Sequence, residues 1–221
     1  MASGSAPIVV VHGEALREVP PELAVFSVTV SASDRDKTAV VTRLTRRASE
    51  VSELLDRFST SIERRETTGV QVNPDFNRRG ERAQRYSGTV TTTVTVSDFD
   101  PLGELLAQLA SGEHTAVAGP WWQLRPGGRP GAEVRREAVT DALERAHEYA
   151  DAVGARVDRI VEIADAEAGG GGHPMMMRAA SFEMADEGFT LFPQAQTVSA
   201  RVRLTVTITE PSVLGSDPAV S

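Results

Sequence analysis

The feature that most constrains the fold is a strict alternation of side chains over residues 86–96. The odd positions are all serine or threonine, and the even positions are mostly apolar or small. Because successive side chains of a strand point to opposite faces, this pattern predicts an antiparallel strand with one face buried. Residues 67–72 also suit a strand, and Asn73-Pro74-Asp75 is expected to end it with turn chemistry. Residues 66–96 are therefore predicted to form a hairpin whose two strands are separated by a long polar segment.

The residues on either side of this hairpin predict strands and helices in a recognisable order. Residues 23–33 alternate like a strand, and residues 38–58 carry apolar side chains at helical spacing, with Asp36 or Thr38 as the candidate cap. Asp100-Pro101 predicts the start of a second helix, with the proline at its first position.

A further strand is predicted over residues 115–124, which contain both tryptophans. Pro120 is expected to place this strand at a sheet edge or at a bulge. Over residues 23–125 the elements thus run strand, helix, strand, strand, helix, strand. This is the order of a ferredoxin-like βαββαβ unit.

The longest helix is predicted over residues 132–153. Four alanines repeat there at every fourth position, which is typical of a helix that lies close against a sheet or another helix: Ala138, Ala142, Ala146 and Ala150. Strands are predicted over residues 8–11, 157–164 and 197–209.

The predicted fold class is α+β, with one antiparallel sheet and about three helices packed on one of its faces. A single domain is expected over residues 7–210. Residues 168–196 lack a clear period and are expected to form a long loop or arm. Residues 1–6 and 211–221 are expected to be flexible tails.

The composition favours a soluble globular protein. The 221 residues are 40% hydrophobic and 24% charged, which is enough to bury a core of good size. The longest apolar run, residues 8–11, is far below the roughly 20 residues that cross a bilayer. The absence of cysteine excludes disulfides and thiolate chemistry. Residues 1–7 lack the basic and apolar regions of a secretion signal, so a cytoplasmic location is expected unless a leader was removed or replaced.

Two segments could carry binding chemistry, and both have a simpler interpretation. Residues 169–177 contain a glycine run, one histidine and three methionines, which are donors that suit Cu(I), but glycines hold no fixed geometry. We therefore expect a flexible arm with packing methionines. Four arginines between Phe76 and Tyr86 could contact phosphates: Arg78, Arg79, Arg82 and Arg85. The net charge of −8 opposes nucleic-acid binding, so a solvated loop or subunit contact is expected.

Catalytic motifs are missing from the sequence. It contains no nucleophile elbow, phosphate-binding loop, dinucleotide fingerprint or zinc-protease helix motif. The four histidines are scattered: His12, His114, His147 and His173. No catalytic residue, cofactor or metal ligand is assigned, and no enzymatic activity is expected.

Several short segments, taken in order, resemble the SIMPL domain family, a family of unknown function that includes a periplasmic immunogenic protein of Brucella. They are residues 9–14 (Val-Val-Val-His-Gly-Glu), 21–25, 67–76, 86–88 and 98–103, and the alanine-rich helix that ends at Gly154. The resemblance spans about residues 7–210. It implies an α+β fold, large homo-oligomers in some members and no established enzymatic activity. Glu22 stands where family members usually have aspartate, and the export signal of many members is absent.

The function expected from these features is a structural or scaffold role, in a protein that self-assembles into a homo-oligomer through exposed strand edges and the loop over residues 165–196. The physical reason is that long alternating strands leave edges that must be paired or covered. The alternative is a monomeric or dimeric adaptor that binds a protein partner through Trp121 and Trp122. Adjacent strand residues point to opposite faces, so one of these indoles is expected in the core and the other at the surface.

Overall fold

The computed structural model describes residues 6–76, 83–166, 183–185 and 188–213. The chain divides into two compact units. The terminal unit comprises Met1–Val19, Pro126–Met176 and Gln196–Ser221, and the central unit comprises Pro20–Arg125 and Met177–Ala195. The single domain expected over residues 7–210 stays a prediction.

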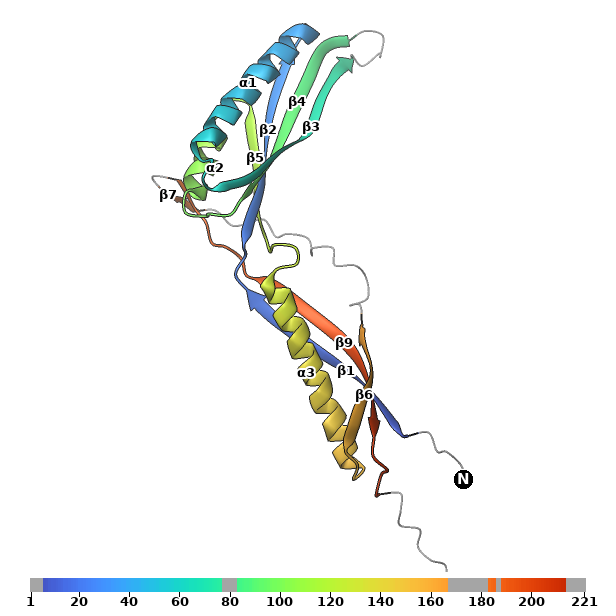
Figure 1. Ribbon diagram of the computed structural model, residues 1–221. Coiled ribbons are helices and arrows are strands. Elements are labelled where there is room, and N and C mark those ends of the chain that lie inside the picture. The colour runs from blue at the N-terminus through green and yellow to red at the C-terminus, as the bar shows by residue number, and fades with distance from the viewer. Residues whose placement is uncertain (1–5, 77–82, 167–182, 186–187, 214–221) are drawn as a thin grey trace, which may run out of the picture. The chain divides into compact units, whose positions relative to one another are not determined.

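The central unit is built on a four-stranded antiparallel sheet (Figure 1). Its strands are β2 (Leu23–Asp34), β3 (Ile62–Phe76), β4 (Ala83–Val96) and β5 (Thr115–Gln123). They lie in the order β3-β4-β2-β5, so β3 and β5 are the edge strands. This order is that of a split βαβ unit, in agreement with the element order over residues 23–125.

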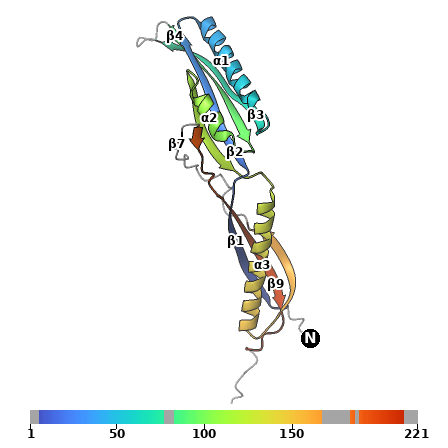
Figure 2. The ribbon, with the colours of Figure 1, turned by 90° about the vertical axis from the view of Figure 1, so that its left-hand side faces the viewer.

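Two helices cover one face of this sheet, as Figure 2 shows. Helix α1 (Lys37–Arg57) begins where Asp36 accepts hydrogen bonds from the backbone N–H groups of Thr38 and Ala39. Helix α2 (Leu102–Ala110) has Pro101 at its N-cap, one position before the predicted one. Phe26 of β2 is fully buried between the sheet and these helices, together with Ala24 and Val28, so one face of the alternating residues 23–33 is the core face.

Strand β3 differs from the prediction at its end. It continues through Asn73-Pro74-Asp75 to Phe76, and Pro74 pairs with Tyr86 of β4. The turn chemistry does not end the strand because β3 lies at the sheet edge, where a residue without a backbone N–H is tolerated.

The terminal unit is built on a three-stranded antiparallel sheet in the order β1-β9-β6. Its strands are β1 (Ile8–Val19), β6 (Val157–Asp165) and β9 (Gln196–Ile208). Strand β1 is much longer than the predicted residues 8–11 because it pairs with β9 along its whole length, from Ile8 to Val19. Helix α3 (Arg129–Ala152) lies on one face, and its four periodic alanines are completely buried, as expected of a close-packed seam.

The prediction of one sheet with three helices on one face is wrong. The described residues form two separate main sheets; α1 and α2 pack on one, and α3 packs on the other. Alternation identifies the buried face of a strand, but it does not identify the sheet in which the strand pairs.

Part of the predicted loop over residues 168–196 has regular structure. Strands β7 (Glu183–Ala185) and β8 (Gly188–Thr190) pair with each other. Phe189 and Leu191 then pack against the core of the central unit. Residues 167–182 and 186–187 lie outside the described residues.

Candidate interaction surface

The segment over residues 9–14 serves packing. A Cβ atom on Gly13 would lie 2.0 Å from the carbonyl oxygen of Ala138 and 2.5 Å from the backbone nitrogen of Ala142. Only glycine therefore lets β1 approach α3 this closely. Glycine at this point and alanines along α3 are the two halves of one contact.

The segment over residues 98–103 has a similar role in the central unit. A Cβ atom on Gly103, in the first turn of α2, would lie 2.2 Å from the carbonyl oxygen of Phe189. Gly103 thus lets the backbone around β8 lie directly on α2. In two of the segments that carry the family resemblance, the glycine is thus required by a close backbone contact.

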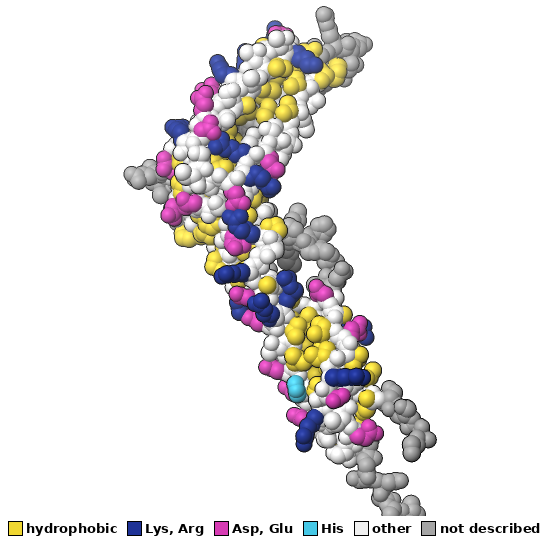
Figure 3. Space-filling model, viewed as in Figure 1, with side chains coloured by type: hydrophobic (Ala, Val, Ile, Leu, Met, Phe, Trp, Pro, Cys, Tyr) yellow, Lys and Arg dark blue, Asp and Glu magenta, His cyan; other side chains and the backbone are white. Residues whose placement is uncertain are grey.

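An apolar groove of about 450 Å³ separates α1 from the edge strand β3. Its lining contains no charged side chain and consists of Val41, Leu44, Thr45, Ala48, Ser49 and Ser52 from α1 with Val70, Val72 and Val90 from the sheet. Val70 is 66% exposed and Val41 is 45% exposed. Figure 3 shows hydrophobic side chains gathered beside α1. The helix therefore leaves part of the apolar side of β3, at Val70, uncovered.

At one end of this region, Arg65 connects β3 to α1. Its guanidinium donates one hydrogen bond to Asp56 at 2.6 Å and another to the carbonyl oxygen of Leu55 at 3.3 Å. These contacts join β3 to the last turns of α1. Farther along the strand, Val72 is half-buried against the core that includes Val40 and Leu44 of α1, whereas Val70 is largely exposed beside the helix.

A comparable uncovered strand occurs at the edge of the terminal unit. Ile160 and Ile163 of β6 stand opposite Val206 and Leu204 of β9, which are buried under α3. The two isoleucines are nevertheless 46% and 52% exposed, because the buried seam of α3 lies over β1 and β9. Neighbouring Val161 is exposed as well.

The four outer strand edges differ in how well they are protected. Strand β1 is capped by α3, since the carboxylate of Asp141 accepts a hydrogen bond from the backbone N–H of Glu14 at 2.8 Å. Strand β5 is short and irregular around Pro120, as predicted. The pairing of β6 shifts register twice within nine residues. The pairing of β3 is unbroken from Gly69 to Asp75.

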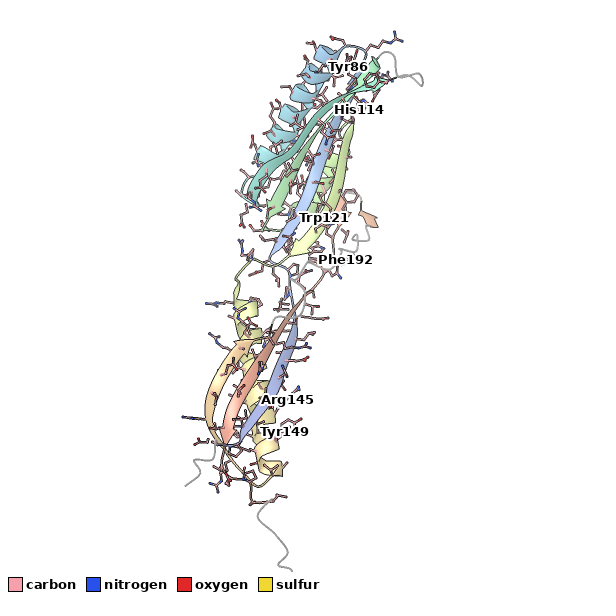
Figure 4. All side chains as sticks on the ribbon, turned by 90° about the vertical axis from the view of Figure 1, so that its right-hand side faces the viewer. Tyr86, His114, Trp121, Arg145, Tyr149 and Phe192 are labelled. Carbon is pink, nitrogen blue, oxygen red and sulfur yellow. The ribbon has the colours of Figure 1, made fainter. Side chains whose placement is uncertain are left out.

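The two tryptophans lie on opposite faces of β5, as predicted. Trp122 is 7% exposed and meets Phe99 edge to face, with ring centroids 5.0 Å apart. Its indole N–H has no hydrogen-bond partner among the described residues. Trp121 is half-buried, and Figure 4 shows it at the opposite end of β5 from His114. Trp121 is the more accessible indole.

Arg125, just after β5, connects three segments at one end of the central sheet. Its guanidinium donates two hydrogen bonds to the Glu63 carboxylate at 2.6 and 2.8 Å, and its backbone N–H donates to Glu22 at 2.8 Å. The hydrogen bonds from Arg125 hold the pKa of Glu63 below its ordinary value. Glu22, which differs from the usual family aspartate, has this backbone group as its partner.

The other predicted candidates are not brought together. Residues 169–177 and three of the loop arginines lie outside the described residues. The fourth, Arg85 on β4, stands opposite Asp75 on β3. His147 on α3 lies 2.7 Å from the carbonyl oxygen of Leu143 through Nδ1. Within the described ranges, no group of three or more histidine or acidic side chains could hold a metal ion, and no helix is long and apolar enough to span a membrane.

Comparison with known protein families shows where the chain belongs. No curated protein matches the chain. The profile of the SIMPL family, described as a protein of unknown function (DUF541), matches residues 9–206. This range includes Gly13, Gly103 and most of the strands and helices of both units. The resemblance inferred from the short segments is thereby confirmed, and the chain belongs to the SIMPL family.

Proposed function

We propose that this protein is a non-enzymatic assembly module that forms a homo-oligomer with a structural role. The observation that supports the proposal is the uncovered apolar side of β3, where Val70 is 66% exposed beside an uncharged groove. Exposed apolar surface of this kind, next to an unpaired strand edge, marks sites of protein association.

The exposed side of β6 gives the protein a second candidate contact. A chain with two separate contact surfaces can join more than one neighbour, and closed symmetry then limits the number of copies. Burying one valine or isoleucine side chain completely is worth about 1.5–3 kcal/mol, so a few such residues supply a useful part of a stable contact.

Light scattering coupled to size exclusion, at several protein concentrations, tests the proposal. We expect a mass well above the 23.7 kDa of one chain and unchanged on moderate dilution. Val70→Lys and Ile163→Lys should each lower this mass, since each places a charge on an apolar contact. Val213→Lys is the matched control, because Val213 is 65% exposed and lies beyond the last strand of its sheet. A mass of 23.7 kDa at every concentration would exclude self-assembly.

An adaptor role is the second candidate, and the position of Trp121 favours it. Aromatic side chains that are accessible on one face of a strand are common anchors for partner proteins. If the protein is a monomer at all concentrations, Trp121→Ala should abolish capture of its partner without changing the fold, and Val70→Lys should not.

A further inference from the structure

Among the four outer strands of the two main sheets, β3 has the most regular edge that no other described segment protects. The β1 edge carries the Asp141 contact, β5 is short and irregular, and β6 shifts register twice. In β3, the residues from Gly69 to Asp75 pair with β4 without a shift, and register shifts flank this stretch on both sides.

We propose that this stretch of β3 pairs antiparallel with the same stretch of a second copy, about a two-fold axis at Val72. The inference rests on the proposed function, self-assembly, and names its contact. A two-fold axis at Val72 places Gly69 opposite Asp75 of the second copy, so the whole unbroken stretch pairs and neither flanking shift enters the ladder.

The side chains of the stretch complement themselves in this register. On the groove side, Val72 meets its own copy, and Val70 meets Pro74 of the second copy, which gives one continuous apolar row. On the other side, Gln71 stands opposite Asn73 of the second copy, so two amide side chains can pair twice. Pro74 has no backbone N–H and contributes only its ring and its carbonyl group.

The charges also agree with this register. Asp75 is the one charged residue of the stretch, and it stands opposite Gly69, so no like charges face each other. Moving the axis to Val70 would bring the irregular pairing around Thr68 into the ladder, and moving it to Pro74 would bring in the shift at Phe76. A slip by one residue would place apolar side chains opposite polar ones.

The resulting contact is isologous and closes on itself, because each copy offers the same strand. It joins two four-stranded sheets into one of eight strands, with the α1 helices of both copies on the same face. The exposed side of β6 belongs to the other unit and is not part of this contact.

The chain has no cysteine, so single cysteine variants report this contact without background. Directly opposed residues of an antiparallel pair have Cα atoms about 4.5–5.5 Å apart, which is within the range of a disulfide. We expect mild oxidation to convert most of the Val72→Cys protein to a covalent dimer. Val213→Cys is the control, at an exposed valine outside both candidate contacts, and Val161→Cys reports separately on β6.

A second pair of variants tests the register and avoids the half-buried Val72. Gln71→Cys and Asn73→Cys change exposed residues, so both should fold normally. A mixture of the two should give several times more cross-linked dimer than either variant alone, since residue 71 faces residue 73 across the axis.

The outcomes separate this inference from the proposed function. If the unmodified protein has an oligomeric mass but neither Val72→Cys nor the mixture cross-links above the Val213→Cys control, the β3 contact is wrong and self-assembly stands. If the unmodified protein is a monomer throughout, both fail. Cross-linking of Val161→Cys alone would assign the contact to β6 and overturn the proposal.

Discussion

Gly13 of β1 lies so close to Ala138 of α3 that a single added methyl group would stand 2.0 Å from the Ala138 carbonyl oxygen. Both residues are completely or almost completely buried, and backbone forms the obstacle on the helix side. Helix and strand must separate to make room. The terminal unit therefore depends on one glycine for its helix-to-sheet distance.

We expect Gly13→Ala to lower the free energy of unfolding by about 1–3 kcal/mol or more, as for other overpacked core positions. Urea denaturation followed by circular dichroism measures the change. Gly131→Ala is the control in the same unit, because its new methyl group would meet nothing closer than an arginine nitrogen at 3.5 Å. It should raise stability slightly, since alanine is the better helix former. Equal effects of the two substitutions would contradict the packing argument.

The close contact also shows what the sequence could and could not predict. The period of four in the alanines of α3 indicated a helix that lies close to its neighbour, and the structure confirms it. The sequence did not indicate that Gly13 supplies the other half, because a glycine before a charged residue also fits the polar end of a strand. Spacing within one segment gives its buried face; the partner comes from tertiary pairing.

The same limit explains the main error in the predicted fold. The alternation in β1, β6 and β9 does not distinguish them from the strands of the central unit, so a single sheet was predicted. Among the described strands of the main sheets, these three pair only with one another. The end of β3 was missed because Asn73-Pro74-Asp75 has strong turn chemistry that an edge position overrides. The groove beside α1 was not predicted either, since its lining comes from three elements whose lateral positions no periodicity reveals.

The capping of the β1 edge by Asp141 gives a second prediction. Asp141→Ala leaves the backbone N–H of Glu14 without its carboxylate partner, and because this group reaches water the cost should be about 1 kcal/mol. Hydrogen exchange at the Glu14 amide should become faster. Arg145→Ala removes the ion pair between Arg145 and Asp141 on α3 but keeps the cap. It should leave exchange at Glu14 unchanged, and slow exchange in both variants would show that another group protects this amide.

The contact between Glu63 and Arg125 makes stability depend on pH. Because the pKa of folded Glu63 is lowered by the hydrogen bonds from Arg125, the ionised form stabilises the folded state. This contribution is complete above the pKa that Glu63 has in the unfolded chain, and it is lost as the pH falls through the lower pKa of Glu63 in the folded protein.

Glu63→Gln tests this contribution by removing the titrating group. The variant should be less stable than the unmodified protein at neutral pH, and the difference should shrink as the solution becomes acidic. Denaturation of both proteins from neutral to acidic pH measures the difference. Asp34→Asn is the positive control: the pKa of Asp34 is also lowered, mainly by the backbone N–H of Asp36, so its stability difference should shrink in acid as well. A Glu63→Gln difference that is constant with pH would contradict the assignment.

The two tryptophans should differ in their access to solvent. Trp122 is 7% exposed and packed against Phe99, whereas Trp121 is half-buried on the opposite face of β5. In Trp121→Phe the remaining indole is Trp122, so its fluorescence should resist quenching by iodide and should lie at shorter wavelength. In Trp122→Phe the remaining Trp121 should be quenched several times more strongly. The Trp122 indole N–H donates no hydrogen bond to the described residues, so the substitution loses packing and no such bond. If iodide quenches Trp121 strongly in the monomer but weakly in the oligomer, this face of β5 lies in a contact between copies.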